Sequence, residues 1–355
     1  MKKQSKNFLA DLINSISPSG YEAPVAKVWK AEAKTFAAKV WTDTHGNSHA
    51  VINPGGSPCV MFAGHYDEIG FQVSHIDDQG FLWIQALGGW DAQIAQGQRV
   101  QIMGRKGIVR GVIGKVAIHL QDECARKRVS EVKDLWVDIG AKDKADAVKR
   151  VAVGDPLVIA YGFEELGNGL AVGRAFDNRA GAFVVLEAAR LLSTLNPHAE
   201  IHAVATVQEE IGLRGATTSA FGIDPDIGIA VDVTFATDHP NMGDAIKRET
   251  LIKLGGGPVL TRGPNINPKL FDLMVKTAKA EAIPCQINAE SRGTGTDANA
   301  LQLNRAGVAT GLIGIPLRYM HSPCEVICLK DLEHCSKLLA KTVAKITPKT
   351  NFVPF

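Results

Sequence analysis

The sequence has no long apolar run: no window approaches 18 uninterrupted apolar residues, so no membrane-spanning helix is expected. It also lacks a surplus of one charge, because 39 Lys and Arg against 37 Asp and Glu leave a formal net charge of +2, without a long basic run. We therefore expect no nucleic-acid partner. Residues 1–16 begin with basic residues, but Asp11 and Asn14 interrupt the apolar stretch. An amphipathic helix is expected there, in place of a signal peptide.

Cysteine is scarce and shows no disulfide framework. The six cysteines are scattered along the chain, which favours reduced thiols and a cytoplasmic location. Residues 321–335 bring three of them together with His321 and His334. A structural zinc site needs paired ligands at tighter spacing, so ordinary buried thiols are the favoured interpretation.

Two kinds of sequence pattern alternate along the chain, and its 355 residues are enough for two domains. Residues 1–66 look α/β, whereas short apolar stretches broken by Gly, Asp and Gln from about 70 to 160 are typical of a small barrel or sandwich. After residue 164, strands and helices alternate again, which predicts a mainly parallel sheet covered by helices on both faces. We therefore predict one discontinuous α/β domain, residues 1–66 and 164–355, interrupted by a β-rich, barrel-like domain, residues 67–163. The charged stretch 121–134 within that insertion is expected to be a solvated loop.

The predicted strands of the α/β domain end in side chains that commonly bind metals. Ligands of open α/β sheets bind beyond the carboxyl ends of the strands. One such residue means little, since Asp177 alone could be a helix cap, but several ends that supply His, Asp or Glu indicate a common site. Imidazole and carboxylate ligands suit a divalent transition metal, zinc first, and this set fits two ions sharing a carboxylate better than one. The residues are His65, Asp67, Glu68, Asp177, Glu209, Glu210, Asp232, Asp238 and His321.

Six segments, in order, resemble the TET (tetrahedral) aminopeptidases, also described as glutamyl aminopeptidases, deblocking aminopeptidases and cellulase M. They are "AGHYDEIGF", "GRAFDNRAG", "VQEEIGLRGA", "AVDVTFATD", "GTGTDANA" and "IPLRYMHSPCEV", and the resemblance covers nearly the whole chain. It implies a zinc-exopeptidase-like catalytic domain interrupted by a β-rich dimerisation domain. It also implies two divalent metal ions per subunit, zinc or else cobalt, and dimers that assemble into tetrahedral dodecamers acting on short peptides.

The resemblance also implies a role for each site residue. Glu209 would be the general base, and Asp67 would orient His65 as a ligand of the first metal. Adjacent residues on an extended strand point to opposite sides, so Glu209 and Glu210 are expected to have different tasks. The remaining implied ligands are Asp232 on the first metal, Glu210 and His321 on the second and Asp177 between both, and the implied substrate-binding residues are Thr296, Asp297, Arg318 and Tyr319.

The implied reaction is hydrolysis of N-terminal residues by a water that bridges two metal ions, with Glu209 moving its proton to the leaving amine. An alternative is another dinuclear amidohydrolase on the same scaffold, a deacylase or a carboxypeptidase-like enzyme. A non-enzymatic scaffold is a further alternative, and a glycosidase would need paired carboxylates flanking a sugar without metal. The preferred N-terminal residue stays open: Lys247, Arg292 or Arg318 would favour an acidic one, although each is more often a structural cation.

Overall fold

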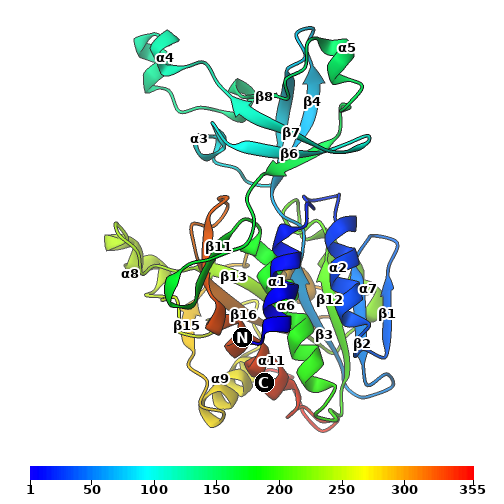
Figure 1. Ribbon diagram of the computed structural model, residues 1–355. Coiled ribbons are helices and arrows are strands. Elements are labelled where there is room, and N and C mark those ends of the chain that lie inside the picture. The colour runs from blue at the N-terminus through cyan, green and yellow to red at the C-terminus, as the bar shows by residue number, and fades with distance from the viewer.

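The computed structural model describes residues 1–355, except the side chains of residues 245, 248 and 249. Figure 1 shows two bodies: a large α/β part that carries both termini, and a smaller β-rich part joined to it by two chain segments. The fold class predicted from the sequence is therefore confirmed.

The α/β part is built around an 11-stranded sheet with the order β1-β2-β12-β3-β13-β16-β17-β11-β10, and β14 and β15 extend from β16. Its central strands β12, β3, β13 and β16 are parallel, whereas antiparallel pairs flank them. The central strands are almost continuously apolar and buried because helices cover both of their faces. The strands are β1 (Lys39–Thr42), β2 (Ser48–Ile52), β3 (Cys59–His65), β10 (Glu164–Glu165), β11 (Leu170–Gly173), β12 (Glu200–Thr206), β13 (Ile227–Phe235), β14 (Val259–Arg262), β15 (Gln286–Ala289), β16 (Ala309–Arg318) and β17 (Glu325–Cys328).

Helix α6 packs closely on one face of the central strands, and α7 and α10 pack on the other. Glycine permits the close approach of α6: a Cβ added to Gly64 of β3 would lie 2.6 Å from the backbone carbon of Gly181 in α6. This packing fixes the beginning of α6 against the carboxyl ends of the strands. The helices are α1 (Lys3–Asn14), α2 (Ala23–Ala33), α6 (Phe176–Leu192), α7 (Arg214–Ile223), α8 (Ile246–Glu249), α9 (Pro268–Ala280), α10 (Asp297–Leu301) and α11 (Leu329–Val343).

The β-rich part is a closed six-stranded barrel with the order β4-β5-β8-β7-β6-β9. It has its own apolar core, in which Phe71, Leu82 and Leu157 are fully buried. The stretch expected to be a solvated loop is exposed, but it contains a short helix, α4. The barrel elements are β4 (Gly70–Ile76), β5 (Leu82–Leu87), α3 (Ala92–Ala95), β6 (Arg99–Gly104), β7 (Gly107–Gly114), α4 (Glu123–Lys127), β8 (Trp136–Asp138), α5 (Lys144–Ala147) and β9 (Pro156–Ile159).

The chain leaves the sheet after β3 and re-enters it at β10. The proposed domain boundaries, 66/67 and 163/164, lie in these two connections and stay a prediction. Within the described residues, none of the helices combines the length and the apolarity needed to cross a membrane.

Candidate metal centre

The seven residues predicted to be catalytic or metal-binding lie together at the carboxyl edge of the parallel strands. They come from the ends of four neighbouring strands and the start of α6, so the sheet holds them on rigid backbone. A cavity of about 530 Å³ opens beside them. The residues are His65 at the end of β3, Asp67 just after it, Asp177 in the first turn of α6, Glu209 and Glu210 after β12, Asp232 in β13 and His321 after β16.

The carboxylate of Asp177 lies between two histidines. Its Oδ1 is 3.3 Å from Nε2 of His65, and its Oδ2 is 3.3 Å from Nε2 of His321. On the first side, Oδ1 of Asp232 lies 3.8 Å from His65; on the second, Oε2 of Glu210 lies 3.4 Å from His321. The arrangement therefore forms two neighbouring groups of nitrogen and oxygen donors that share one carboxylate.

Glu209 and Glu210 have different neighbours. Oε2 of Glu209 lies 3.7 Å from Nε2 of His65, whereas Glu210 approaches His321. Their backbone N–H groups both donate to the carboxylate of Asp67, at 3.1 and 3.3 Å. The same carboxylate lies 3.4 Å from Nδ1 of His65 and accepts a hydrogen bond from Ser19 at 2.6 Å. Asp67 thus fixes the ring of His65 and the loop that carries both glutamates.

Burial raises the pKa of Glu209, Glu210 and Asp232, and neighbouring carboxylates add to this rise. Burial is the main cause that raises the pKa of Glu209 to about 10; His65 opposes this rise and Asp232 adds to it. Burial also raises the pKa of Asp232 well above its ordinary value. Despite burial, hydrogen bonds from the two histidines lower the pKa of Asp177, and the bond with Asp177 is the first cause that raises the pKa of His321 to about 11.

This donor set fits divalent cations. Crowded, buried carboxylates are costly unless positive charge lies between them, and imidazole with carboxylate is a donor set of zinc. In addition, Oε1 of Glu210 is buried and has no hydrogen-bond partner among the described residues. His65, Asp177 and Asp232 could hold one ion, and Asp177, Glu210 and His321 a second.

Several residues in or near the cluster have a positive φ. One of them is a cluster residue and the others lie within three residues of one, and for residues other than glycine this conformation costs free energy. Such outliers concentrate at functional sites, where the surrounding structure holds the chain in place. They are Ala175, Gln208, Leu213, Tyr319 and His321.

The sequence reasoning missed Glu325, which lies beneath the cluster. Its carboxylate is buried and accepts the backbone N–H groups of Asp177 and of His321, both at 3.0 Å. It thereby joins the segments that carry the shared carboxylate and the second histidine. The sequence offered one signal for a role of Glu325: it is the only acidic residue of β17, a strand that is otherwise apolar.

A buried ion-pair network supports the other side of the cluster. Glu68 accepts hydrogen bonds from Arg174 at 2.5 Å and from Arg179 at 2.7 Å. Arg179 is fully buried and also donates to the backbone carbonyls of Ser15 and Tyr66, at 2.6 and 3.0 Å. The network ties the chain after α1 to the segment between the sheet and the barrel. Glu68 was predicted to lie at the site, and the structure places it in this network.

A loop of the barrel also contacts the cluster. A Cβ added to Gly88 would lie 3.4 Å from Cβ of Glu210, and one added to Gly89 would lie 3.3 Å from Nδ1 of His321. The next residue, Trp90, stacks on Phe71 of the barrel core at 4.6 Å. The barrel therefore forms part of the wall around the second donor group.

Of the four residues expected to bind substrate, only Thr296 lines the cavity beside the cluster. Asp297 is buried and accepts a hydrogen bond from Thr206. Arg318 is paired with Asp238 at 2.8 Å, and Tyr319 is half exposed outside the cavity lining. The substrate-binding roles of these residues stay predictions. Residues not predicted also line the cavity: Val233, Phe235, Thr261, Asn288, Glu290, Asn299, Leu312 and Met320.

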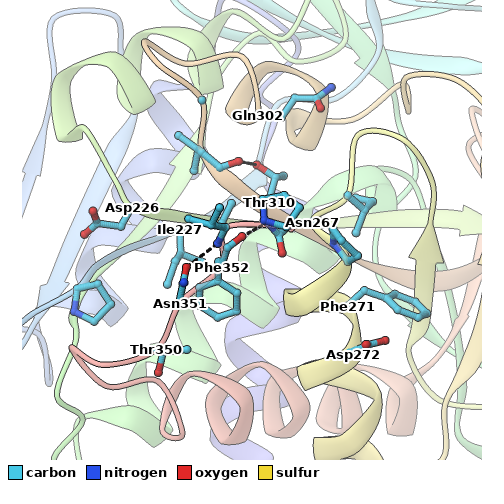
Figure 2. Close-up of a pocket in the computed structure, with 18 of the residues that line it drawn as sticks. Asp226, Ile227, Asn267, Phe271, Asp272, Gln302, Thr310, Thr350, Asn351 and Phe352 are labelled. Carbon is cyan, nitrogen blue, oxygen red and sulfur yellow. Dashed lines mark hydrogen bonds between the residues drawn. The ribbon is translucent and has the colours of Figure 1, made fainter.

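A larger cavity, about 1370 Å³, lies away from this cluster. Figure 2 shows it around the C-terminal segment, of which Thr350, Asn351 and Phe352 are labelled among the lining residues. Nδ2 of Asn267 donates to the backbone carbonyl of Phe352 at 2.7 Å. None of the residues predicted to be catalytic or metal-binding lines it.

The fold and the cluster of imidazole and carboxylate donors suit a metal-dependent hydrolase. The chain belongs to the M42 glutamyl aminopeptidase family, whose family model matches residues 46–338. It is therefore a peptidase, and its activity is that of an aminopeptidase, as the resemblance predicted.

One relative and two solved structures match this protein over nearly the whole chain. A lysyl aminopeptidase of Pyrococcus furiosus is 37% identical, over 98% of this chain and 99% of the relative. The crystal structure of a TET aminopeptidase from a marine-sediment Thaumarchaeota archaeon has a TM-score of 0.91 and 36% identity, and covers 97% of this chain and 98% of its own. A Pyrococcus horikoshii TET1 peptidase, described as assembling into a tetrahedron or a large octahedral shell, has a TM-score of 0.85 and 29% identity, with 96% and 100% covered.

Proposed function

We propose that this protein removes N-terminal residues from short peptides with two divalent cations held around Asp177. The observation that carries the proposal is that the two oxygens of Asp177 face different histidines, His65 and His321, at the same distance of 3.3 Å. A carboxylate in this position suits two ions better than one. Because the donors are only nitrogen and oxygen, zinc is the proposed metal, with cobalt as a substitute.

When bound, the two ions would act as Lewis acids and lower the pKa of a water at the site. Glu209 would take a proton in the reaction; its carboxylate lines the cavity and lies 3.7 Å from Nε2 of His65, which supports this role. It would then pass this proton to the leaving amine. Asp67 holds the loop of Glu209 through a backbone N–H group and so keeps the base in position.

A basic N-terminal residue is the proposed preference. Glu290 lines the cavity outside the donor groups, and no Lys or Arg is among the described residues that line it. The apolar side chains of Val233, Leu312 and Met320 would contact the aliphatic part of a lysine or arginine. The relative that is named a lysyl aminopeptidase supports the same preference.

Assembly through the barrel is also proposed. Large apolar side chains are exposed on it, including Ile118 at 61%, Leu120 at 80% and Val129 at 62%. All three lie in the segment 118–129, and exposed apolar surface that is contiguous commonly marks a contact between proteins. A second copy is the proposed partner, and dimers would form a closed shell like those named for the TET neighbours.

Metal removal tests the core of the proposal. Exhaustive chelation should abolish hydrolysis of aminoacyl-nitroanilides, and zinc or cobalt should restore it. Asp177→Asn should lower the zinc content at both positions, because both groups of donors include this carboxylate. Full activity after complete chelation would refute the metal requirement.

The role of Glu209 requires a separate measurement. Glu209→Gln should keep the zinc content but lose at least about 100-fold in kcat, the usual lower limit for removing a general base. Glu164→Gln, an exposed change on β10 outside the cavity lining, is the matched control. Near-normal turnover of the Glu209 variant would show that another group moves the proton.

The proposed substrate preference predicts faster hydrolysis of lysyl and arginyl than of glutamyl nitroanilide. In Glu290→Gln, the ratio of kcat/KM for lysyl over methionyl substrate should fall roughly fivefold, the equivalent of about 1 kcal/mol of partly screened ion pairing. An unchanged ratio would exclude Glu290 as the determinant and leave the reaction itself unaffected.

A further inference from the structure

A second cluster of metal-binding side chains lies at the opposite edge of the same sheet. Cys59 is the first residue of β3, Glu200 is the first of β12, and His202 follows two residues later. One ligand atom from each, the thiol sulfur, a carboxylate oxygen and an imidazole nitrogen, lie within 4.8 Å of one another. None of these residues takes part in the catalytic cluster.

The sheet register explains why these side chains meet. Glu200 is directly paired with Cys59 in the parallel ladder of β12 and β3, so both side chains project from the same face. His202 shares that face because side chains alternate along a strand. The donors therefore stand on central strands, which hold them more rigidly than a surface loop would.

This cluster is distinct from the catalytic one. Cys59 and His65 occupy opposite ends of β3. Six residues of extended chain separate them by roughly 20 Å at ~3.3 Å per residue. An ion near Cys59 would therefore not contact the proposed catalytic ions.

The surroundings favour a cation. Nε2 of His202 lies 2.7 Å from Oε1 of Glu200, and a second carboxylate, that of Asp226, accepts the backbone N–H of Cys59 at 2.8 Å. Asp226 lies at the edge of the cavity in Figure 2. His202 is about nine-tenths buried, and its Nδ1 has no hydrogen-bond partner among the described residues. Cys59 is only partly buried, so an ion can reach it.

We propose that Cys59, Glu200 and His202 form a second metal site, for zinc or a similar divalent transition metal. Thiolate, carboxylate and imidazole are the three side-chain ligands that zinc uses in proteins, and three protein ligands leave a position for water. Binding joins the zinc ion to the Cys59 sulfur and releases the thiol proton to solvent. The ion would then clamp the beginnings of β3 and β12 together.

Cobalt distinguishes this site from the catalytic one, because the proposed catalytic ligands include no sulfur. Full-length protein loaded with Co²⁺ should show a thiolate-to-cobalt charge-transfer absorption, and Cys59→Ser should remove it. Cys285→Ser is the matched control, since Cys285 is also partly buried but belongs to no donor cluster among the described residues. The control should keep the absorption.

Zinc content gives an independent measurement. Wild-type protein should bind one more zinc ion per chain than Cys59→Ser or His202→Ala. In these two variants, the affinity of this site for zinc should fall by more than the roughly 10–100-fold that loss of an outer-shell partner costs. Aminopeptidase activity should persist in both variants, which separates this result from any failure of the proposed catalytic centre. Equal zinc content and identical cobalt spectra in wild type and both variants would overturn the proposal.

Discussion

Glu22 offers a quantitative test of how the catalytic loop is supported. It lies just before α2, is only 7% exposed, and accepts backbone N–H groups from Gly20 at 2.6 Å and Gln208 at 3.2 Å. Burial, and then the nearby charge of Asp67, raise the pKa of this carboxyl to about 7, although the backbone hydrogen bonds oppose the rise. We predict that Glu22→Gln stabilises the protein at neutral and alkaline pH.

The magnitude follows from the shift in the pKa of Glu22, from its ordinary value of 4.5 to about 7. At about 1.36 kcal/mol per pKa unit, this shift corresponds to about 3 kcal/mol. Because the folded-state pKa is raised, the stabilising contribution of the protonated carboxyl is fully present below pH 4.5 and is lost as the pH rises to about 7. Glutamine never ionises, so the variant should gain on the wild type across this window and keep its advantage above it.

Urea unfolding of both proteins across this pH range, followed by tryptophan fluorescence, measures the difference in the free energy of unfolding. The ionisable residues of the candidate metal centre are present in both proteins, so the comparison isolates the change at residue 22. Glu32→Gln is the matched control on α2, because it removes a partly buried ion pair with Arg190 at 2.6 Å. This control variant should not become more stable than the wild type at any pH in the range. A stability difference between Glu22→Gln and wild type that does not change with pH would refute the reasoning.

Three further substitutions test the supports of the metal centre and the assembly. Glu325→Gln leaves one acceptor oxygen for two backbone N–H groups. Zinc affinity, measured by competition with a chelator, should therefore fall about 10–100-fold. An unchanged zinc affinity would show that these two hydrogen bonds do not support the metal centre. Gly89→Ala places a Cβ 3.3 Å from Nδ1 of His321. In a zinc titration, this variant should show weaker zinc binding at one of the two proposed positions and unchanged binding at the other. Equal loss of affinity at both positions would contradict a local effect. Leu120→Asp charges a side chain that is 80% exposed on the barrel and should lower the mass measured by light scattering, whereas an unchanged mass would place the interface elsewhere.

The position of the site could be predicted from the sequence because the central strands are recognisable. Strands buried on both faces read as apolar runs, and their carboxyl ends are where α/β sheets bind ligands. His65 and Asp232 could therefore be placed from strand pattern alone. The two histidines are far apart in the chain, yet His321 joins the cluster because β16 is parallel to β13 and adjacent to it.

The supports of the site could not be predicted, because their partners are distant in the sequence. Glu325 contacts the backbone of Asp177, 148 residues away, and Ser19 contacts Asp67 across 48 residues. Arg318 was expected from its position in the sequence to contact the substrate. In the structure its guanidinium instead forms an ion pair with Asp238. Only the closed tertiary structure shows which charged groups are already paired.

Glu209 and Glu210 have different neighbours, but the physical reason differs from the one expected. Strand alternation was expected to separate their side chains, but β12 ends at Thr206 and the pair lies in the following loop. Gln208, with a φ of 53°, turns the chain, and both glutamate N–H groups then donate to Asp67. Because that carboxylate also faces His65, one buried acid fixes the proposed base, one proposed ligand and the loop that bears another. Substitutions at Asp67 should therefore impair metal binding and proton transfer together, whereas Glu209→Gln should impair proton transfer alone.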